Sequence, residues 1–179
     1  MHPKNQDKTI VNITYVDTDL GLMIACASKK GICMFEFADH EHLDLQISRI
    51  SKAFKATLVE SENPYFDTLR QQLKEYFKGE RKEFDISLDL VGTDFQKKVW
   101  KSLMQIPYGS TISYGEQAKR IGKPKAVRAV ANANAKNKIS IILPCHRVIG
   151  ANGKLTGYGG GLWRKEKLLE FEQQHNNIR

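Results

Sequence analysis

Ser113-Tyr114-Gly115-Glu116 opens the stretch that decides the fold of this chain, and the alanine-rich residues 126–135 close it. A Ser followed three residues later by Glu is a capping box, which starts a helix by satisfying its free N–H groups. Gly122-Lys123-Pro124 lies between the two ends. Because Gly ends helices and Pro suits a first helical turn, a second helix is expected from Pro124 to about Ala135. Two short helices joined by a tight turn predict a helix-turn-helix.

The second helix of this pair has mostly small side chains, with Arg128 as its long cation near the start. A helix that reads base edges in the major groove carries several long polar side chains. Small residues more often indicate tight packing between helices, but they also allow close approach to a ligand. Arg128 and its basic surroundings favour DNA as that ligand.

Charge divides the chain into two unlike halves. Residues 92–179 carry 16 Lys and Arg against 5 Asp and Glu, a net charge of +11, whereas residues 1–91 carry 12 against 15, a net charge of −3. A basic half beside a mildly acidic half predicts that one part meets a polyanion. A solvated basic surface is the ordinary alternative, so charge alone does not decide for nucleic acid.

Composition predicts a globular protein of the cytoplasm. Apolar residues make up 41% of the chain, and no apolar run is long enough to span a bilayer. The N-terminus is polar, so a signal peptide is not expected. Three cysteines cannot all pair, and reduced thiols are the simplest interpretation. Cys26, Cys33, His40 and His42 have the ligand types of a zinc site, but the cysteines fall within predicted strands, where core packing is the commoner explanation.

The first half of the chain has the pattern of a mixed α and β unit. Strands are expected at residues 10–15, 22–27, 31–37 and 84–90, the second and third forming a hairpin, and helices are expected around 43–50 and 69–77. Thr93-Asp94-Phe95-Gln96 is another capping box, so a new unit begins just before it. We therefore expect domains at 1–91 and 92–179.

Cys145 occupies the position of a candidate nucleophile. Residues 139–143 are an apolar run that predicts a strand, and the run ends at Pro144-Cys145-His146-Arg147. A cysteine held rigidly after a strand and a proline suits a nucleophile, and His146 and Arg147 add positive charge that favours the thiolate. Adjacent side chains seldom bond directly, so a base role for His146 needs a bridging water. The ordinary alternative is an inert buried cysteine.

Residues 92–172 resemble the catalytic domain of the O6-alkylguanine-DNA alkyltransferases. The matching segments are Gly92-Thr93-Asp94-Phe95-Gln96, Val99-Trp100, Ile106-Pro107-Tyr108-Gly109-Ser110-Thr111, Ser113-Tyr114, Arg128-Ala129-Val130, Asn137, Leu143-Pro144-Cys145-His146-Arg147-Val148-Ile149, Gly157-Tyr158, Gly160-Gly161-Leu162, Lys165, Leu168-Leu169 and Glu172. The resemblance implies an α+β fold, with an N-terminal ribonuclease-H-like α/β domain and a mostly helical winged helix-turn-helix catalytic domain. The first half carries little motif and is assigned by association.

The resemblance implies a role for each matching catalytic residue. Cys145 is expected to accept the alkyl group. His146 is expected to take the thiol proton through water, with Glu172 holding the imidazole in place. Asn137 is expected to brace the turn before Cys145, and Tyr114 is expected to donate to N3 of the departing guanine.

Other matching positions are implied to hold the base and the DNA. The pocket is expected to use the main-chain carbonyls of Cys145 and Val148. Its wall is expected to come from the loop with Tyr158, Gly159 and Gly160. The damaged nucleotide must rotate out of the duplex, and Arg128 is expected to fill the gap. Tyr114 and three small residues are expected to touch the DNA through the minor groove; the small residues are Ala126, Ala129 and Ala131.

Two positions depart from the family pattern. Lys138 stands where the family often has proline, which predicts a looser turn. Gly159 has no side chain where some relatives carry a hydroxyl or a longer group. This predicts one contact fewer to O6 and a pocket widened toward bulky alkyl groups.

Together these observations predict a DNA repair protein that moves the alkyl group of O6-alkylguanine in double-stranded DNA irreversibly to its own Cys145. The thioether has no good leaving group, so each molecule acts once. We expect a monomer that uses no cofactor and no metal and does not bind membranes, and we leave O4-alkylthymine open as a second lesion. The alternatives are a winged-helix protein that binds lesions or regulates without alkyl transfer, and a Cys-His hydrolase. A regulator does not account for the joint presence of Tyr114, Asn137, Cys145, His146 and Glu172. A relative that only binds lesions is expected to lack the acceptor cysteine, and a hydrolase would turn over and show no dependence on DNA.

Overall fold

The computed structural model describes residues 9–177. Its N-terminal part is a sheet of β1 (Thr9–Thr18), β2 (Gly21–Ala27), β3 (Ile32–Phe37) and β4 (Ala56–Glu60), in the order β3-β2-β1-β4. β1, β2 and β3 pair antiparallel, and β4 runs parallel to β1. The first three expected strands and the hairpin are confirmed, whereas β4 lies where no strand is predicted.

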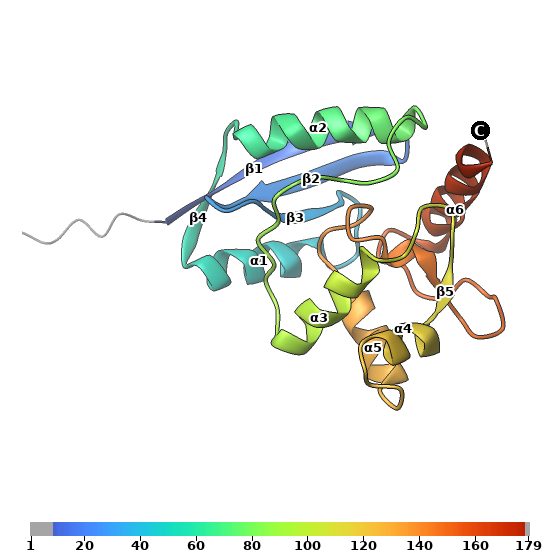
Figure 1. Ribbon diagram of the computed structural model, residues 1–179. Coiled ribbons are helices and arrows are strands. Elements are labelled where there is room, and N and C mark those ends of the chain that lie inside the picture. Colours follow the sequence, from blue (N-terminus) through green and yellow to red (C-terminus); the bar gives the residue numbers. More distant parts are fainter. Residues whose placement is uncertain (1–8, 178–179) are drawn as a thin grey trace, which may run out of the picture.

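Helices α1 (Leu43–Phe54) and α2 (Pro64–Phe77) cover opposite faces of this sheet (Figure 1). Alternation along β2 sorts its side chains, because Met23 and Ala25 pack on the α2 side while Ile24 and Cys26 pack on the α1 side. Both expected helices are confirmed. Burial on both faces explains why β2 is a continuous apolar run.

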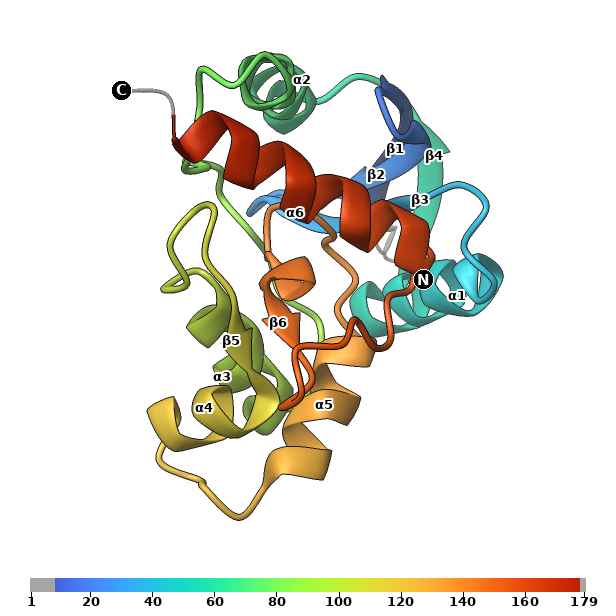
Figure 2. The ribbon, with the colours of Figure 1, turned by 90° about the vertical axis from the view of Figure 1, so that its right-hand side faces the viewer.

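The C-terminal part is mostly helical. It contains α3 (Asp94–Leu103), β5 (Ile112–Ser113), α4 (Tyr114–Arg120), α5 (Val127–Ala135), the 3-10 turn η1 (Cys145–Arg147), β6 (Val148–Ile149) and α6 (Leu162–Asn176). Figure 2 shows α6 lying between the sheet domain and the helices α3, α4 and α5. The expected α+β architecture is confirmed. Within residues 9–177, no helix combines the length and the apolar character needed to cross a membrane.

One hydrophobic core joins the two parts. A single cluster of buried side chains contains Phe37 and Phe66 from the sheet domain together with Leu103, Leu143 and Leu168. The core therefore continues across the proposed division between the domains. This shared core fixes the position of the sheet domain relative to Cys145.

Helices α4 and α5 form the expected helix-turn-helix. The Ser113 side chain accepts from Glu116 N at 3.0 Å, but the Glu116 carboxylate pairs with Arg120 and leaves the capping box half formed. Gly122 has a φ of +75°, a left-handed conformation that favours glycine and ends the helix.

The expected start of α5 at Pro124 is wrong, because the helix begins at Val127. Lys123 O and Ala126 N first close a separate turn, with a hydrogen bond of 2.9 Å. Proline therefore lies in the connecting turn, which shortens α5 at its exposed end.

The strands predicted at residues 84–90 and 139–143 are also wrong. Each segment touches β3 at one isolated bridge, Leu88 with Ile32 and Ile139 with Phe35. Because β3 is the last strand of the sheet, its outer edge is free for these short contacts. The chain turns away directly after Ile139, so Cys145 follows a turn and not a strand.

Candidate active site

A tight turn after α5 presents the sulfur of Cys145. Asn137 holds this turn from within, because its Oδ1 accepts from Ile139 N at 2.9 Å and its Nδ2 donates to Leu143 O at 2.9 Å. The same Nδ2 donates to Cys145 Sγ at 3.3 Å. Ile141 has a φ of +72°, which costs a residue of this kind about 1–3 kcal/mol. The turn is thus held in a conformation that its sequence does not favour.

Behind Cys145, Glu172 is the centre of a buried polar group. Its carboxylate accepts from His146 Nε2 at 2.7 Å, from Tyr76 OH at 2.8 Å, and from Arg147 Nε and Nη2 at 2.9 Å each. Burial alone would raise the pKa of Glu172, but the facing His146 and Arg147 hold this pKa well below its usual range. Glu172 is therefore ionised.

The position of the hydrogen on His146 follows from this arrangement. A carboxylate only accepts hydrogen bonds, so the hydrogen lies on Nε2. Burial lowers the pKa of the imidazole, so the ring is neutral near neutral pH. Its Nδ1 is buried and has no hydrogen-bond partner within residues 9–177. His146 thus has one nitrogen free to accept a proton.

The Cys145 thiol is protonated at rest. Burial raises its pKa to about 11, although the Asn137 hydrogen bond and Lys165 act in the opposite direction. The expectation that Arg147 favours the thiolate is wrong, because this guanidinium binds Glu172 and donates to Ile106 O at 2.8 Å. The thiol therefore needs a base when it reacts.

Lys165 is a site residue to which the sequence assigned no role. It is fully buried, and its Nζ donates to Val148 O at 2.7 Å and to Thr156 O at 2.8 Å. The same Nζ lies 5.9 Å from the ring centroid of Tyr114. Lys165 therefore joins the strand after the nucleophile to the loop that forms the pocket wall. The one signal in the sequence that pointed to Lys165 was its position in the family match.

A pocket of about 240 Å³ opens onto Cys145. The predicted site residues that line it are Tyr114, Ala131, Asn137, Cys145, Tyr158 and Gly159. Those buried in the surrounding structure are His146, Val148, Gly160 and Glu172, and those on the outer part of α5 and its N-terminal end are Ala126, Arg128 and Ala129. Glu36 and Ser140 also line the pocket, and no sequence motif predicted either of them.

The sheet domain fills the space beside Gly159. A Cβ added at Gly159 would collide with His40 Nε2, and a Cβ added at Gly160 would collide with the ring of Phe37. The expected widening of the pocket at Gly159 is therefore wrong, because an imidazole from the other domain already occupies that side.

Lys138 does not loosen its turn as expected. Its Nζ donates to Val91 O at 3.0 Å and lies 5.1 Å from the ring centroid of Trp100. Its carbonyl accepts from Phe35 N at 2.8 Å. The turn is thus tied both to the segment that connects the domains and to β3.

The two faces of α5 use small residues differently. On the inner face, Trp100 Nε1 donates to Ala133 O at 2.8 Å, and Asn134 Nδ2 donates to Gln117 Oε1 at 2.6 Å. On the outer face, Arg128 and Ala129 are exposed, and Arg128 forms no ion pair with any residue between 9 and 177. The inner face confirms the interpretation of tight packing between helices, whereas close approach to DNA through the exposed outer face stays a prediction.

The residues considered as zinc ligands form no metal site. Cys26 and Cys33 pack in the core on the α1 side of the sheet, where burial raises the pKa of Cys26 to about 12. Across the described part of the chain, no group of three His, Cys, Asp or Glu side chains is placed to hold a metal ion.

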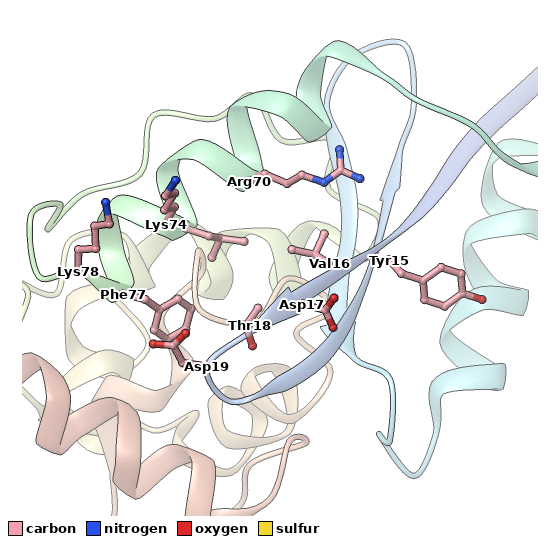
Figure 3. A pocket seen from close by; sticks show the side chains of 10 residues that line it. Tyr15, Val16, Asp17, Thr18, Asp19, Arg70, Lys74, Phe77 and Lys78 are labelled. Atoms are coloured by element: carbon pink, nitrogen blue, oxygen red, sulfur yellow. The ribbon is translucent and has the colours of Figure 1, made fainter.

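A second hollow of about 510 Å³ lies between β1 and α2 (Figure 3). Asp17 and Asp19 lie on one side of it, Arg70 and Lys74 come from α2, and Lys78 directly follows that helix. It shares no lining residue with the Cys145 pocket and contains neither Cys nor His. We assign it no role in the chemistry.

The fold and the site define a class of protein, in which a helix-turn-helix domain carries a candidate cysteine nucleophile with a buried His-Glu pair behind it. Residues 11–90 match the ribonuclease-like domain of 6-O-methylguanine DNA methyltransferase, and residues 94–174 match its DNA binding domain. The chain belongs to the 6-O-methylguanine DNA methyltransferase family. The resemblance seen in the sequence is thereby confirmed, including the ribonuclease-like assignment of the first half.

Two relatives named methylated-DNA--protein-cysteine methyltransferase illustrate the match. The protein of Methanosarcina barkeri is 44% identical over 164 residues, which cover 92% of this chain and 97% of that protein. The protein of Mycobacterium bovis is 66% identical over 102 residues, which cover 57% of this chain and 62% of that protein. The chain therefore spans less than two thirds of the length of this second relative.

Solved structures match over nearly the whole chain. A crystal structure of the Mycobacterium tuberculosis O6-methylguanine methyltransferase has a TM-score of 0.80 and 43% identity, covering 94% of this chain and 96% of that one. A crystal structure of the M. tuberculosis OGT in complex with DNA has a TM-score of 0.77 and 43% identity, covering 93% and 94%.

Proposed function

We propose that this protein repairs double-stranded DNA by moving the alkyl group of O6-alkylguanine to Cys145 Sγ, where the group stays. The observation that carries the proposal is the contact series from Asn137 to Cys145 and from His146 to Glu172, beside an open pocket. A nucleophile, a base and a carboxylate that orients the base are the groups that such a transfer needs. The names of the relatives and the DNA-bound OGT support the same substrate class.

The transfer begins with the thiol proton, which passes through a water to His146 Nδ1. The sulfur then forms an S–C bond to the alkyl carbon while the C–O6 bond breaks and its electron pair enters the purine. Tyr114 donates to N3 as this charge develops. Guanine finally gains a proton at N1, which balances the proton lost from Cys145, and the protein holds a neutral thioether.

The products determine the stoichiometry. A thioether on Cys145 has no good leaving group, and the transfer consumes the only thiol lining the pocket among the described residues. Each protein molecule therefore acts once, as a methylated-DNA--protein-cysteine methyltransferase that is spent by its own reaction.

The outer face of α5 is proposed to meet the duplex. The target base must leave the stack before Cys145 can reach it, which costs a few kcal/mol. Arg128 is exposed and enters the gap that the base leaves. The small residues around it let the helix approach the minor groove; these are Ala126, Ala129 and Ala131.

Selection of guanine is proposed to use main-chain groups of the pocket. The carbonyls of Cys145 and Val148 accept from the exocyclic amine. Val148 O already accepts from Lys165 Nζ at 2.7 Å, which leaves one of its lone pairs. The loop with Tyr158, Gly159 and Gly160 closes the pocket near O6.

We further infer a monomer that acts in the cytoplasm. One chain contains every group that the transfer uses, so no second copy is needed. Cys26, Cys33 and Cys145 are all free thiols, as a reducing compartment favours.

The test of this function follows the lesion in the DNA. A duplex with one O6-methylguanine is mixed with the full chain at several ratios, then digested, and the remaining modified base is measured. We expect one lesion to disappear for each protein molecule, with ordinary guanine in its place. Binding without loss of the lesion would favour the lesion-binding alternative, and loss of many lesions per molecule would favour a hydrolase.

A further inference from the structure

One wall of the Cys145 pocket belongs to the sheet domain. Glu36, on β3, lines this pocket together with Ser140 and Tyr158. Its Oε1 accepts from Phe37 N at 2.9 Å and from Ser140 Oγ at 3.0 Å, and its side chain is 1% exposed. A buried carboxyl group, supplied by the domain without catalytic motifs, thus forms part of the site.

His40 packs between this carboxyl group and the pocket loop. Its Nδ1 accepts from His42 N at 2.9 Å, so the neutral ring carries its hydrogen on Nε2. This Nε2 lies 4.0 Å from Glu36 Oε2 and occupies the space beside Gly159. Glu36 is therefore covered by an imidazole on one side and faces the pocket on another.

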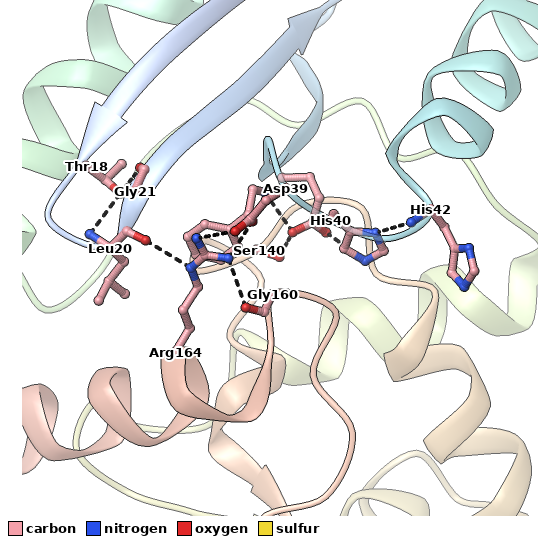
Figure 4. Close-up of polar contacts among 11 residues, drawn as sticks. Thr18, Leu20, Gly21, Asp39, His40, His42, Ser140, Gly160 and Arg164 are labelled. Atoms are coloured by element: carbon pink, nitrogen blue, oxygen red, sulfur yellow. Dashed lines mark hydrogen bonds and ion pairs between the residues drawn. The ribbon is translucent and has the colours of Figure 1, made fainter.

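Arg164 of α6 fixes this wall in place (Figure 4). Its guanidinium binds the two carboxylate oxygens of Asp39 at 2.6 and 3.1 Å, and it donates to Gly160 O at 3.0 Å and to Leu20 O at 2.9 Å. Asp39 belongs to the segment that follows Glu36, and Gly160 belongs to the pocket loop. One side chain thus holds the wall and the loop together.

We infer that Glu36 is a specificity-determining residue that selects alkyl groups by their charge, an inference that rests on the proposed alkyl transfer. The alkyl group must lie against Cys145 Sγ when it transfers, in the pocket that Glu36 also lines. A carboxylate repels another anion strongly where water is largely excluded. The pocket therefore accepts neutral alkyl groups and disfavours a group with its own carboxylate, such as a carboxymethyl group.

This selection depends on pH, because burial raises the pKa of Glu36 to about 7. The other groups that face Glu36 keep their charge between about pH 6.5 and about pH 8.5. Arg164 stays a cation, and burial lowers the pKa of His40, which is neutral there. Burial also raises the pKa of Cys145 to about 11 and the pKa of Tyr158 well above its usual value. Discrimination against an anionic group therefore increases as Glu36 loses its proton.

The test compares two adducts that differ in charge and hardly in size. Duplexes with O6-carboxymethylguanine and with its neutral isostere O6-carbamoylmethylguanine react with the full chain, and mass spectrometry follows the gain on Cys145. We expect the carbamoylmethyl-to-carboxymethyl rate ratio of the unmodified protein to rise about tenfold between about pH 6.5 and about pH 8.5. In Glu36→Gln the carbamoylmethyl-to-carboxymethyl rate ratio should be equally low at both pH values. Glu41→Gln, the same change at an exposed position outside the pocket, should behave as the unmodified protein does.

Several results would overturn this inference: a ratio that does not change with pH, the same pH dependence in Glu36→Gln, or no carboxymethyl transfer by either form at either pH. The pH series of the unmodified protein needs no variant, so a misfolded Glu36→Gln, detected by thermal melting, leaves the test intact. A third duplex with O6-methylguanine separates the two claims. Failure of methyl transfer contradicts the proposed function, whereas methyl transfer with a constant ratio contradicts selection by Glu36 alone.

Discussion

The two walls of the Cys145 pocket are encoded in different ways. Asn137 and Cys145 form the local wall, with His146 buried behind it, and all three are close in sequence and take their places through one turn. Glu36 comes from the other domain and reaches the pocket because a shared core and Arg164 hold that domain in place. The nucleophile is thus specified by local sequence, while the charge of the pocket is specified by tertiary structure.

Replacing His146 with Gln removes the base behind the local wall and should have the largest effect. General-base catalysis contributes about 10²- to 10⁴-fold, so the alkyl-transfer rate should fall by this factor. Without the base, the thiolate must form by titration. Because burial raises the Cys145 pKa to about 11, the rate of the variant should rise about tenfold per pH unit. The unmodified protein should change little above about pH 7, since burial lowers the pKa of His146.

Rapid-quench kinetics at several pH values above about pH 7 would measure the pH profiles of His146→Gln and of the unmodified protein. A variant with the same pH profile as the unmodified protein would show that His146 does not act as the base.

Replacing Glu172 with Gln tests the buried polar group behind Cys145. In this group, Glu172 of α6 binds His146 and Arg147. The change leaves the Arg147 guanidinium buried without its counter-ion, so the free energy of unfolding should fall by about 3–5 kcal/mol. Glu170→Gln on the same helix breaks an exposed pair with Lys167 at 3.4 Å, and it should cost less than about 1 kcal/mol. Urea unfolding measures both, and equal losses would contradict the assigned role of Glu172.

The sequence predicted which residues gather around Cys145 better than it predicted the path of the chain that carries them. The Cys145 motif and the cap at Ser113 depend on neighbouring residues, so a local pattern was enough to find them. The predicted strand at residues 139–143 was wrong, because Asn137 and the edge of β3 impose a turn on an apolar run. No pattern indicated Glu36, since a Glu within a strand has no motif until the fold places it.

Alkylation of Cys145 should itself destabilise the local wall of the pocket. Cys145 Sγ lies 3.3 Å from Asn137 Nδ2 in a packed turn, so an added methyl group must displace neighbours at a cost of about 1–3 kcal/mol. Protein that has reacted with a methylated duplex should melt at a lower temperature than protein incubated with an undamaged duplex. An unchanged midpoint would show that the turn accepts the methyl group without strain.

The smallest effect is expected from the hydrogen bond that joins the two domains at Glu172. Tyr76→Phe removes the 2.8 Å bond to this carboxylate while Arg147 and His146 still hold it, so unfolding should become easier by about 1.5 kcal/mol. Tyr65→Phe on the same helix removes an exposed bond to Lys29 O at 3.3 Å and should cost less than about 0.5 kcal/mol. Calorimetry compares the stabilities of the two variants. An unchanged stability of Tyr76→Phe would mean that this hydrogen bond does not couple the domains.

The most direct test of alkyl transfer to Cys145 is the intact mass of the protein after it meets a duplex with one O6-methylguanine. We expect a gain of one methyl group, mapped to the peptide that contains Cys145, and no gain in Cys145→Ala. No gain on the unmodified protein, or the same gain on Cys145→Ala, would contradict alkyl transfer to this sulfur.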